Sequence, residues 1–258
     1  MSDNQFEEYR RELNELNLKT REDLENLTKP LIKEATKIIL KKSSKEPKDS
    51  HLKSQFGGQP YFEKGEKWPK TKGGDNLEFV FQIFNENNIA LPKNIKLIQF
   101  YYDFNRDELS IGTDDDGWHV KIYENLHKEN IEIIKKPSKH NTVKYCEIEY
   151  EVIQSLPDWE GIDACCENAS KLSCVLNEDE PWENYDKIVE ELVGEQDIWS
   201  QLGSYPHWIQ GFENENNYTF LFQIDSEENA GLMWGDCGLI YVFYDTENKK
   251  LEFLLQCY

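Results

Sequence analysis

Phe79-Val80-Phe81-Gln82-Ile83 is the stretch that decides the fold, because it occurs twice with one substitution. The second copy, Phe220-Leu221-Phe222-Gln223-Ile224, has Leu221 where the first has Val80. Both copies are short apolar runs rich in aromatic and branched residues, which predicts buried strands. A glutamine interrupts each run at the same place. We therefore expect a strand-rich chain with an internal duplication.

Neighbouring blocks repeat in the same order around the two strands. Residues 56–62, Phe-Gly-Gly-Gln-Pro-Tyr-Phe, match residues 202–208, Leu-Gly-Ser-Tyr-Pro-His-Trp. The apolar stretch 97–103 likewise matches 239–245, and Leu109 matches Leu251, which predicts a further strand starting near Leu109. The spacing predicts two antiparallel units of turn, strand, strand and strand, over about 52–115 and 202–258.

The regions outside the repeats predict helices and a few extra strands. Residues 1–45 form an N-terminal helical segment with an apolar stripe from Leu24 to Ile39, a start at Thr20 and a kink or restart at Pro30. The rest, 46–258, is one domain with an insert at about 117–200. Within the insert, 118–123 and 144–153 alternate as strands, whereas 156–172 and 184–193 have helical spacing. The predicted fold class is α+β, strand-rich, with an N-terminal helix and peripheral helices.

The composition excludes several classes of partner. The formal net charge is −21, which disfavours binding to nucleic acid and to an anionic membrane surface. The simplest interpretation is a solvated acidic surface, and such a surface also attracts a basic protein partner. No signal peptide or membrane-spanning run is visible, and the six cysteines are scattered, so we expect a cytoplasmic protein with reduced thiols.

Known catalytic and metal motifs do not occur in the sequence. Asp114-Asp115-Asp116-Gly117 resembles part of a calcium loop, but Gly112 and Tyr123 occupy positions that need carboxylates. The histidines and cysteines lack zinc-ligand spacing, and no nucleophile elbow or phosphate-binding loop is present. We therefore expect no metal, no cofactor and no catalytic residue, which favours a non-enzymatic role.

Five residues are the best candidates for ligand binding. Gln82 and Gln223 are polar residues in apolar strands; they either hydrogen-bond across the sheet, which we favour, or line a shared cleft. Trp234 and Asp236 belong to the glycine-rich segment 234–238, which is either a tight turn or the wall of a cleft. His207 lies in an aromatic turn, where a packed histidine is the default.

Several short segments together carry a resemblance to a known family. They are Phe56-Gly57-Gly58-Gln59-Pro60-Tyr61, Trp68-Pro69, Phe81-Gln82-Ile83, Gly203-x-Tyr205-Pro206 with Ile209-Gln210-Gly211, Trp234-Gly235-Asp236-Cys237-Gly238 and Leu255-Gln256-Cys257-Tyr258. In this order and spacing, over about 52–258, the chain resembles the bacterial YwqG-type family of unknown function. The resemblance implies a compact, cytoplasmic, duplicated, strand-rich domain and brings no catalytic residues. Ser204 departs from the expected double glycine.

These observations support three functional hypotheses. The first is a non-enzymatic binding protein that holds a basic protein partner on an acidic surface, similar in style to small acidic immunity proteins encoded near bacterial toxins. The alternative is a small-molecule binder or enzyme with its pocket at the repeat interface, where Gln82, Gln223, Trp234, Asp236 and His207 would act. The third is a scaffolding module that docks through its N-terminal helix.

Overall fold

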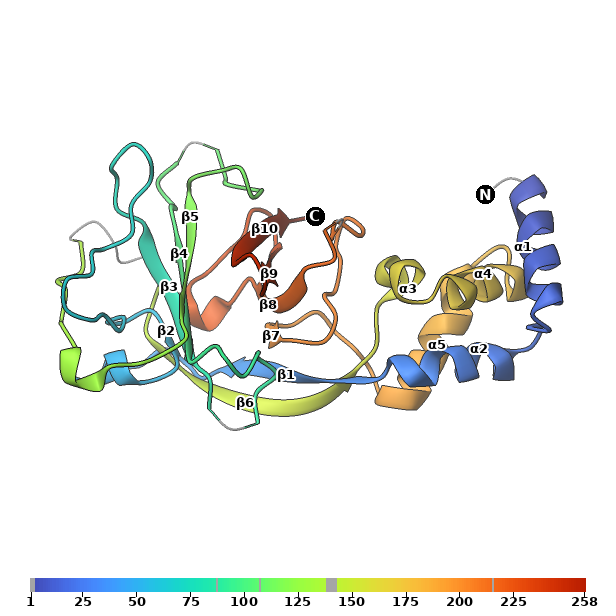
Figure 1. The fold of residues 1–258 in the computed structure, drawn as a ribbon, viewed down its shortest axis with the longest axis horizontal. Helices are drawn as coiled ribbons and strands as arrows, with labels where there is room; N and C mark the ends of the chain where they lie inside the picture. The colour runs from blue at the N-terminus through green and yellow to red at the C-terminus, as the bar shows by residue number, and fades with distance from the viewer. Residues whose placement is uncertain (1–2, 87, 107, 138–142, 215) are drawn as a thin grey trace. The chain divides into compact units, whose positions relative to one another are not determined.

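The computed structural model describes residues 3–86, 88–106, 108–137, 143–214 and 216–258, and it combines one large sheet with several helices (Figure 1). The helices are α1 (Asp3–Glu15), α2 (Arg21–Thr28), α3 (Trp159–Cys165), α4 (Glu167–Leu176) and α5 (Pro181–Val193), with 3₁₀ turns at Lys29–Leu31, Ser50–Leu52, Lys128–Asn130 and Glu228–Ala230. The strands are β1 (Lys33–Leu40), β2 (Gln55–Phe56), β3 (Glu78–Phe84), β4 (Leu97–Tyr102), β5 (Trp118–Tyr123), β6 (Cys146–Ser155), β7 (Gln201–Leu202), β8 (Thr219–Asp225), β9 (Leu239–Asp245) and β10 (Lys250–Gln256). The predicted α+β class is confirmed.

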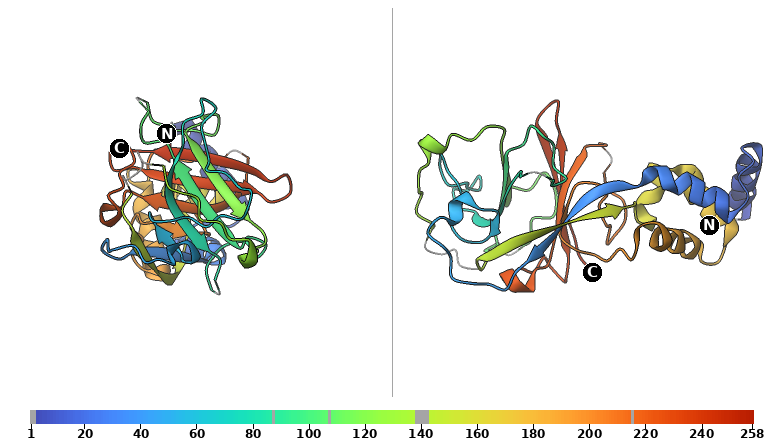
Figure 2. Two further views of the ribbon diagram at one scale, coloured as in Figure 1. Left: turned by 90° about the vertical axis from the view of Figure 1, so that its left-hand side faces the viewer. Right: turned by 90° about the horizontal axis from the view of Figure 1, so that it is seen from below.

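The strands form one ten-stranded antiparallel sheet in the order β10-β9-β8-β7-β1-β6-β2-β3-β4-β5. The long strands β1 and β6 are central neighbours and lie side by side in Figure 1 and in the right-hand view of Figure 2. Four strands follow on each side of them: β2 to β5, called here the first half, and β7 to β10, the second half. The sheet curls until these halves face each other, which gives a nearly closed, barrel-like arrangement.

The two halves share several local features. The antiparallel pairing of β3 with β4 shifts register between Phe79 and Phe81. The pairing of β8 with β9 shifts register at the corresponding place, between Phe220 and Phe222. The turn after β7 also copies the turn after β2, because Ser204 has a φ of 65° where Gly58 has 72°. Serine therefore takes the same left-handed backbone conformation as the glycine that it replaces.

The third strand of the first half differs from the prediction. Residues near Leu109 form no strand, and the strand that pairs with β4 begins only at Trp118. The reason is that the segment before it contacts another partner: the Ile111 carbonyl accepts a hydrogen bond from the Leu255 N–H of β10. The match of Leu109 with Leu251 is thus a match of sequence and not of strand position.

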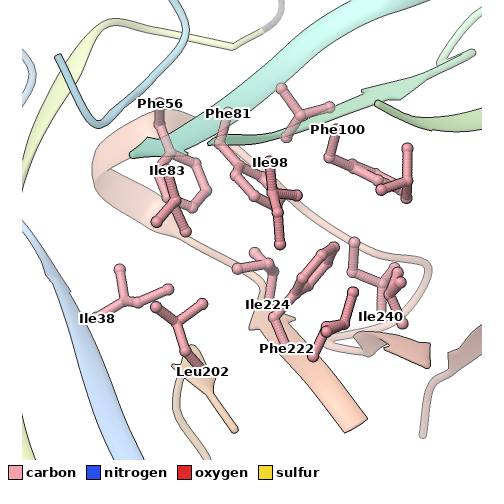
Figure 3. Close-up of a cluster of buried hydrophobic side chains, with 14 of the residues drawn as sticks. Ile38, Phe56, Phe81, Ile83, Ile98, Phe100, Leu202, Phe222, Ile224 and Ile240 are labelled. Carbon is pink, nitrogen blue, oxygen red and sulfur yellow. The ribbon is translucent and has the colours of Figure 1, made fainter. Parts of the chain in front are cut away.

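Aromatic and branched side chains from both halves fill the core of the sheet (Figure 3). The ring of Phe81 in β3 meets that of Phe222 in β8 edge to face, with 5.1 Å between centroids. Phe56 and Phe100 stack on Phe81 at 5.2 and 5.7 Å. These contacts join the repeated strands to each other, because aromatic rings bury large areas and prefer offset and edge-to-face geometry.

The N-terminal helical prediction is wrong for residues 33–40, which form β1. The helix α2 starts at Thr20 as predicted, with a capping box formed by Thr20 and Asp23. Pro30 then lies in a 3₁₀ turn and ends the helix, because proline lacks an N–H and clashes with the preceding turn. Beyond it, burial alternates at Thr36, Ile38 and Leu40, the period of a strand.

The helices of the insert largely follow the prediction. The predicted helix over 156–172 is divided at Cys166 into α3 and α4, whereas the predicted helix over 184–193 is α5, which begins at Pro181. Contacts divide the chain into two units: a helical unit of 1–35, 153–198 and 204–215, and a sheet unit of 36–152, 199–203 and 216–258. No helix among the described residues is long and apolar enough to cross a membrane.

Candidate functional site

Gln82 is fully buried in β3, and the structure gives it a structural role. Its Oε1 accepts hydrogen bonds from the Tyr61 N–H at 2.9 Å and from the Gln99 amide at 3.1 Å. Its Nε2 donates to the carbonyls of His51 and Lys53 at 3.2 and 2.8 Å. These four bonds tie three chain segments to the strand, which leaves little hydrogen-bonding capacity for a ligand.

Gln223 has the corresponding structural role in the second half. It is also fully buried, and its Nε2 donates to the Trp199 carbonyl at 2.8 Å. Its partner across the ladder is Gln201, just as Gln82 pairs with Gln55. The two glutamines thus each hold the segment that precedes the short strand of their own half.

Trp234 and Asp236 lie in a turn before β9. Trp234 is fully buried, and its ring packs on those of Tyr102 and Phe104 at 5.2 and 5.6 Å. Asp236 is exposed, and its carbonyl accepts the Tyr258 N–H at 3.2 Å. This arrangement is that of a tight turn with an aromatic anchor.

His207 is the one predicted residue that lines a pocket of the helical unit. The pocket has a volume of about 430 Å³, and we call it the acidic pocket. Its polar lining residues are Asp158, Tyr185, Asp186, Glu190, Glu195, Gln196 and His207. The helix α5 supplies Tyr185, Asp186 and Glu190, and the turn after β7 supplies His207.

Asp158 connects the elements around the acidic pocket. It is the N-cap of α3, with Oδ1 accepting the Gly161 N–H at 2.8 Å. Its Oδ2 accepts the Trp208 N–H at 2.6 Å, which holds the aromatic turn against the start of the helix. An aspartate before a helix is favoured because its side chain satisfies an otherwise unpaired N–H.

Burial shifts the protonation of the groups around the pocket. Desolvation raises the pKa of Asp158 to about 7, although the two backbone hydrogen bonds oppose this shift. Partial desolvation also raises the pKa of Asp186, whose side chain stays open to solvent. Burial lowers the pKa of His207 to about 4, so its ring is neutral near neutral pH.

The lining of the acidic pocket is therefore one-sided in charge. Four carboxyl groups line it, from Asp158, Asp186, Glu190 and Glu195, and none of its lining residues is a lysine or arginine. Several carboxylates in a partly desolvated hollow repel each other, and a cation relieves that repulsion. The arrangement suits an ammonium or guanidinium group.

A known sequence family covers most of the chain and all of this pocket. The family described as Domain of unknown function (DUF1963) matches residues 54–253. The chain belongs to the DUF1963 family. No curated protein matches it in sequence. The DUF1963 region includes the whole sheet apart from β1 and the end of β10, and it includes α3, α4 and α5.

Metal binding has no support in the described part of the DUF1963 domain. No group of three or more His, Cys, Asp or Glu side chains among the described residues is placed to hold an ion. The segment 114–117 lies in a turn before β5: Asp115 accepts hydrogen bonds from the Ile111 and Gly112 N–H groups, and Asp116 accepts one from the Lys72 N–H. Asp115 thus serves backbone N–H groups of its own loop, whereas Asp116 bonds to a neighbouring turn and pairs with Arg106 at 3.0 Å.

The raised pKa of Asp158 predicts a specific pH dependence of stability. A carboxyl that is harder to ionise when folded favours the folded state at low pH, and this contribution is lost as the pH rises from its ordinary value of 3.8 to about 7. His207 acts in the opposite direction between about 4 and 6.5, because it is harder to protonate when folded. The stability of Asp158→Asn relative to the wild type should therefore rise between about pH 4 and pH 7 and change little above that.

Urea unfolding at several pH values measures this difference. The control is Asp179→Asn, an exposed aspartate in the turn before α5. A difference between wild type and Asp158→Asn that does not change with pH would contradict the assignment.

Sequence reasoning missed the acidic residues of the pocket. Asp158 stands in Leu156-Pro157-Asp158-Trp159, where an aspartate before a helical pattern signals an N-cap. That signal gives the start of a helix, but it says nothing of the contact with Trp208, which is far away in the chain. Asp186 and Glu190 lie four residues apart in α5 and share one helix face, a spacing visible in the sequence.

Proposed function

We propose that this chain is a non-enzymatic binding protein that receives a cationic side chain of a basic protein partner in the acidic pocket. The observation that carries the proposal is the hollow of about 430 Å³ with four carboxyl groups and no lysine or arginine in its lining. A guanidinium group fits such a site well, because its fork of N–H donors bonds to carboxylates in pairs.

The overall charge supports a protein as the source of that cation. A formal net charge of −21 attracts a basic partner over a longer range than the pocket itself. The pocket then supplies the short-range recognition that a diffuse acidic surface lacks. We include three further points in this proposal. The protein has an immunity-like role in the cytoplasm, it is of the YwqG type, and both halves of its sheet originate from one repeated unit.

A free cationic small molecule is the second candidate. The volume of the acidic pocket lies within the range of small-molecule sites, about 300–1,000 Å³. The sequence analysis placed a small-molecule pocket at the repeat interface, with Gln82 and Gln223. In this second candidate the small molecule binds in the acidic pocket of the helical unit instead. Of the five predicted ligand residues, it retains His207.

Removing one carboxylate from the pocket is expected to weaken cation binding at least about tenfold. The test is calorimetric titration of the protein with tetra-arginine peptide and, separately, with arginine amide. Asp186→Asn and Glu190→Gln each remove one charge-assisted hydrogen bond, which contributes about 1.5–3 kcal/mol. Affinity should also rise as the pH passes through about 7, because Asp158 then ionises.

The matched control is Glu183→Gln on the same helix, whose carboxylate pairs with Lys187 outside the pocket. It should bind like the wild type. Tight binding of the peptide alone supports the protein partner, and equal binding of arginine amide supports the small molecule. If neither probe distinguishes the pocket variants from the control, the acidic pocket is not the binding site.

A further inference from the structure

A second hollow lies in the sheet unit, between the two edge strands β5 and β10. It has a volume of about 460 Å³. Val120 and Ile122 of β5 and Leu251 of β10 form its apolar wall. Because β5 and β10 are the two ends of the strand order, this hollow is where the curled sheet fails to close. We call it the seam.

One end of the seam is closed. The rings of Trp118 and Phe253 stack with 5.0 Å between centroids and an angle of 22°. The Thr113 hydroxyl bonds to both the N–H and the carbonyl of Phe253, at 3.0 and 3.2 Å. The Leu255 N–H donates to the Ile111 carbonyl. At this end, the loop before β5 therefore already hydrogen-bonds to the backbone groups on the outer edge of β10.

The other end leaves a strand edge unpaired. The strand β5 pairs with β4 on one side. In the described parts of the chain, no backbone group between Val120 and Ile122 has a hydrogen-bond partner on the opposite side. Such an edge presents N–H and carbonyl groups to any extended chain that reaches it. The seam next to it gives the side chains of that chain a place to enter.

Carboxylates surround the mouth of the seam. Glu63, Glu66 and Glu124 line it, and Lys249, which pairs with Glu124 at 2.9 Å, is the only lysine in its lining. Glu66 is fixed by the Tyr123 hydroxyl at 2.8 Å and by Lys121 at 2.7 Å. Glu63 contacts the ring of His127 at 3.0 Å. With three glutamates and one lysine in its lining, the mouth keeps a net negative charge, whereas the wall is apolar.

We infer that the seam binds an extended peptide that adds as a strand to the free edge of β5, with apolar and basic residues in alternation. Side chains of a strand point to opposite faces with a period of two. Apolar residues of the peptide pack on Val120, Ile122 and Leu251, and the basic residues between them reach the acidic mouth. Backbone bonds to β5 supply affinity, as in other cases of strand addition. The stack of Trp118 on Phe253 limits the added strand to a few residues.

The probe is acetyl-Val-Arg-Val-Arg-amide, followed by NMR of the ¹⁵N-labelled protein. The expected result is chemical-shift change and slowed amide exchange in β5 and at Leu251. A version of the peptide methylated on alternate backbone nitrogens keeps its charge and side chains but cannot pair. It should bind at least tenfold more weakly, and so should acetyl-Val-Glu-Val-Glu-amide.

Two charge variants on adjacent residues sharpen the test. Lys249→Glu removes the lysine at the mouth and should tighten binding severalfold, whereas Lys250→Glu changes the same net charge outside the seam and should act less. Equal binding of the methylated peptide, shifts confined to the acidic pocket, or no binding at all would overturn the inference. It stands apart from the proposed function, because Asp186→Asn should leave peptide binding at β5 unchanged.

Discussion

Phe81→Ala should lower the free energy of unfolding by about 4 kcal/mol, the largest effect that we expect from a single core substitution. The side chain is fully buried and contacts the rings of Phe56, Phe100 and Phe222. Its removal leaves a cavity between the two halves of the sheet, and the stacked rings around it can relax only partly. Urea unfolding followed by tryptophan fluorescence measures the loss.

The control for this substitution is Tyr258→Ala, because that residue is 73% exposed. Its effect should stay within about 0.5 kcal/mol. A loss below about 1 kcal/mol for Phe81→Ala would show that the halves do not depend on each other for packing. That result would contradict a core shared by β3 and β8.

Gln82→Leu should lower the free energy of unfolding by about 3 kcal/mol, although leucine is apolar and of similar size. The substitution leaves the Tyr61 N–H and the His51 and Lys53 carbonyls without their partner in a buried place. A buried polar group without a hydrogen bond costs about 1–3 kcal/mol. The same unfolding experiment measures the effect.

Gln154→Leu is the matched control, since Gln154 is an exposed glutamine of β6. It should change stability little. If Gln82→Leu instead kept full stability and lost binding of a ligand, Gln82 would be a ligand residue and its structural assignment would be wrong.

The repeated strand shows which parts of the fold local sequence patterns can predict. The residue types and the length of the two repeated runs were enough to predict β3 and β8. A short run of aromatic and branched residues is typical of a buried strand. Helical spacing likewise placed a helix over 184–193, which is most of α5. These signals are local, and so tertiary contacts had little power to override them.

β1 shows where local reasoning failed. Leu24 to Ile39 has enough apolar residues to satisfy a helical stripe, yet the last part also fits a period of two. Pro30 and the β-branched residues Thr36 and Ile38 favour the strand. What decides between them is pairing with β6 and β7, which lie more than a hundred residues away in the chain.

The acidic pocket could not be predicted from the sequence, because it too depends on contacts between segments that are distant in the chain. His207 was one of five predicted residues, and the other four lie in buried or turn positions outside the pocket lining. Asp158 gains its contact with Trp208 only when the turn after β7 folds onto the start of α3. With 50 acidic residues in the chain, no spacing rule selects the few that meet.

The sequence by itself determined the class of the fold, the repeated strands and the acidic character of the protein, because periodicity and net charge are properties of the chain alone. The tertiary structure decided that the two glutamines hold their own halves together, since only the fold brings the carbonyls of His51, Lys53 and Trp199 to them. It also decided which carboxylates share a hollow and which strand edge stays open. Both depend on contacts between distant segments, which a local pattern does not encode.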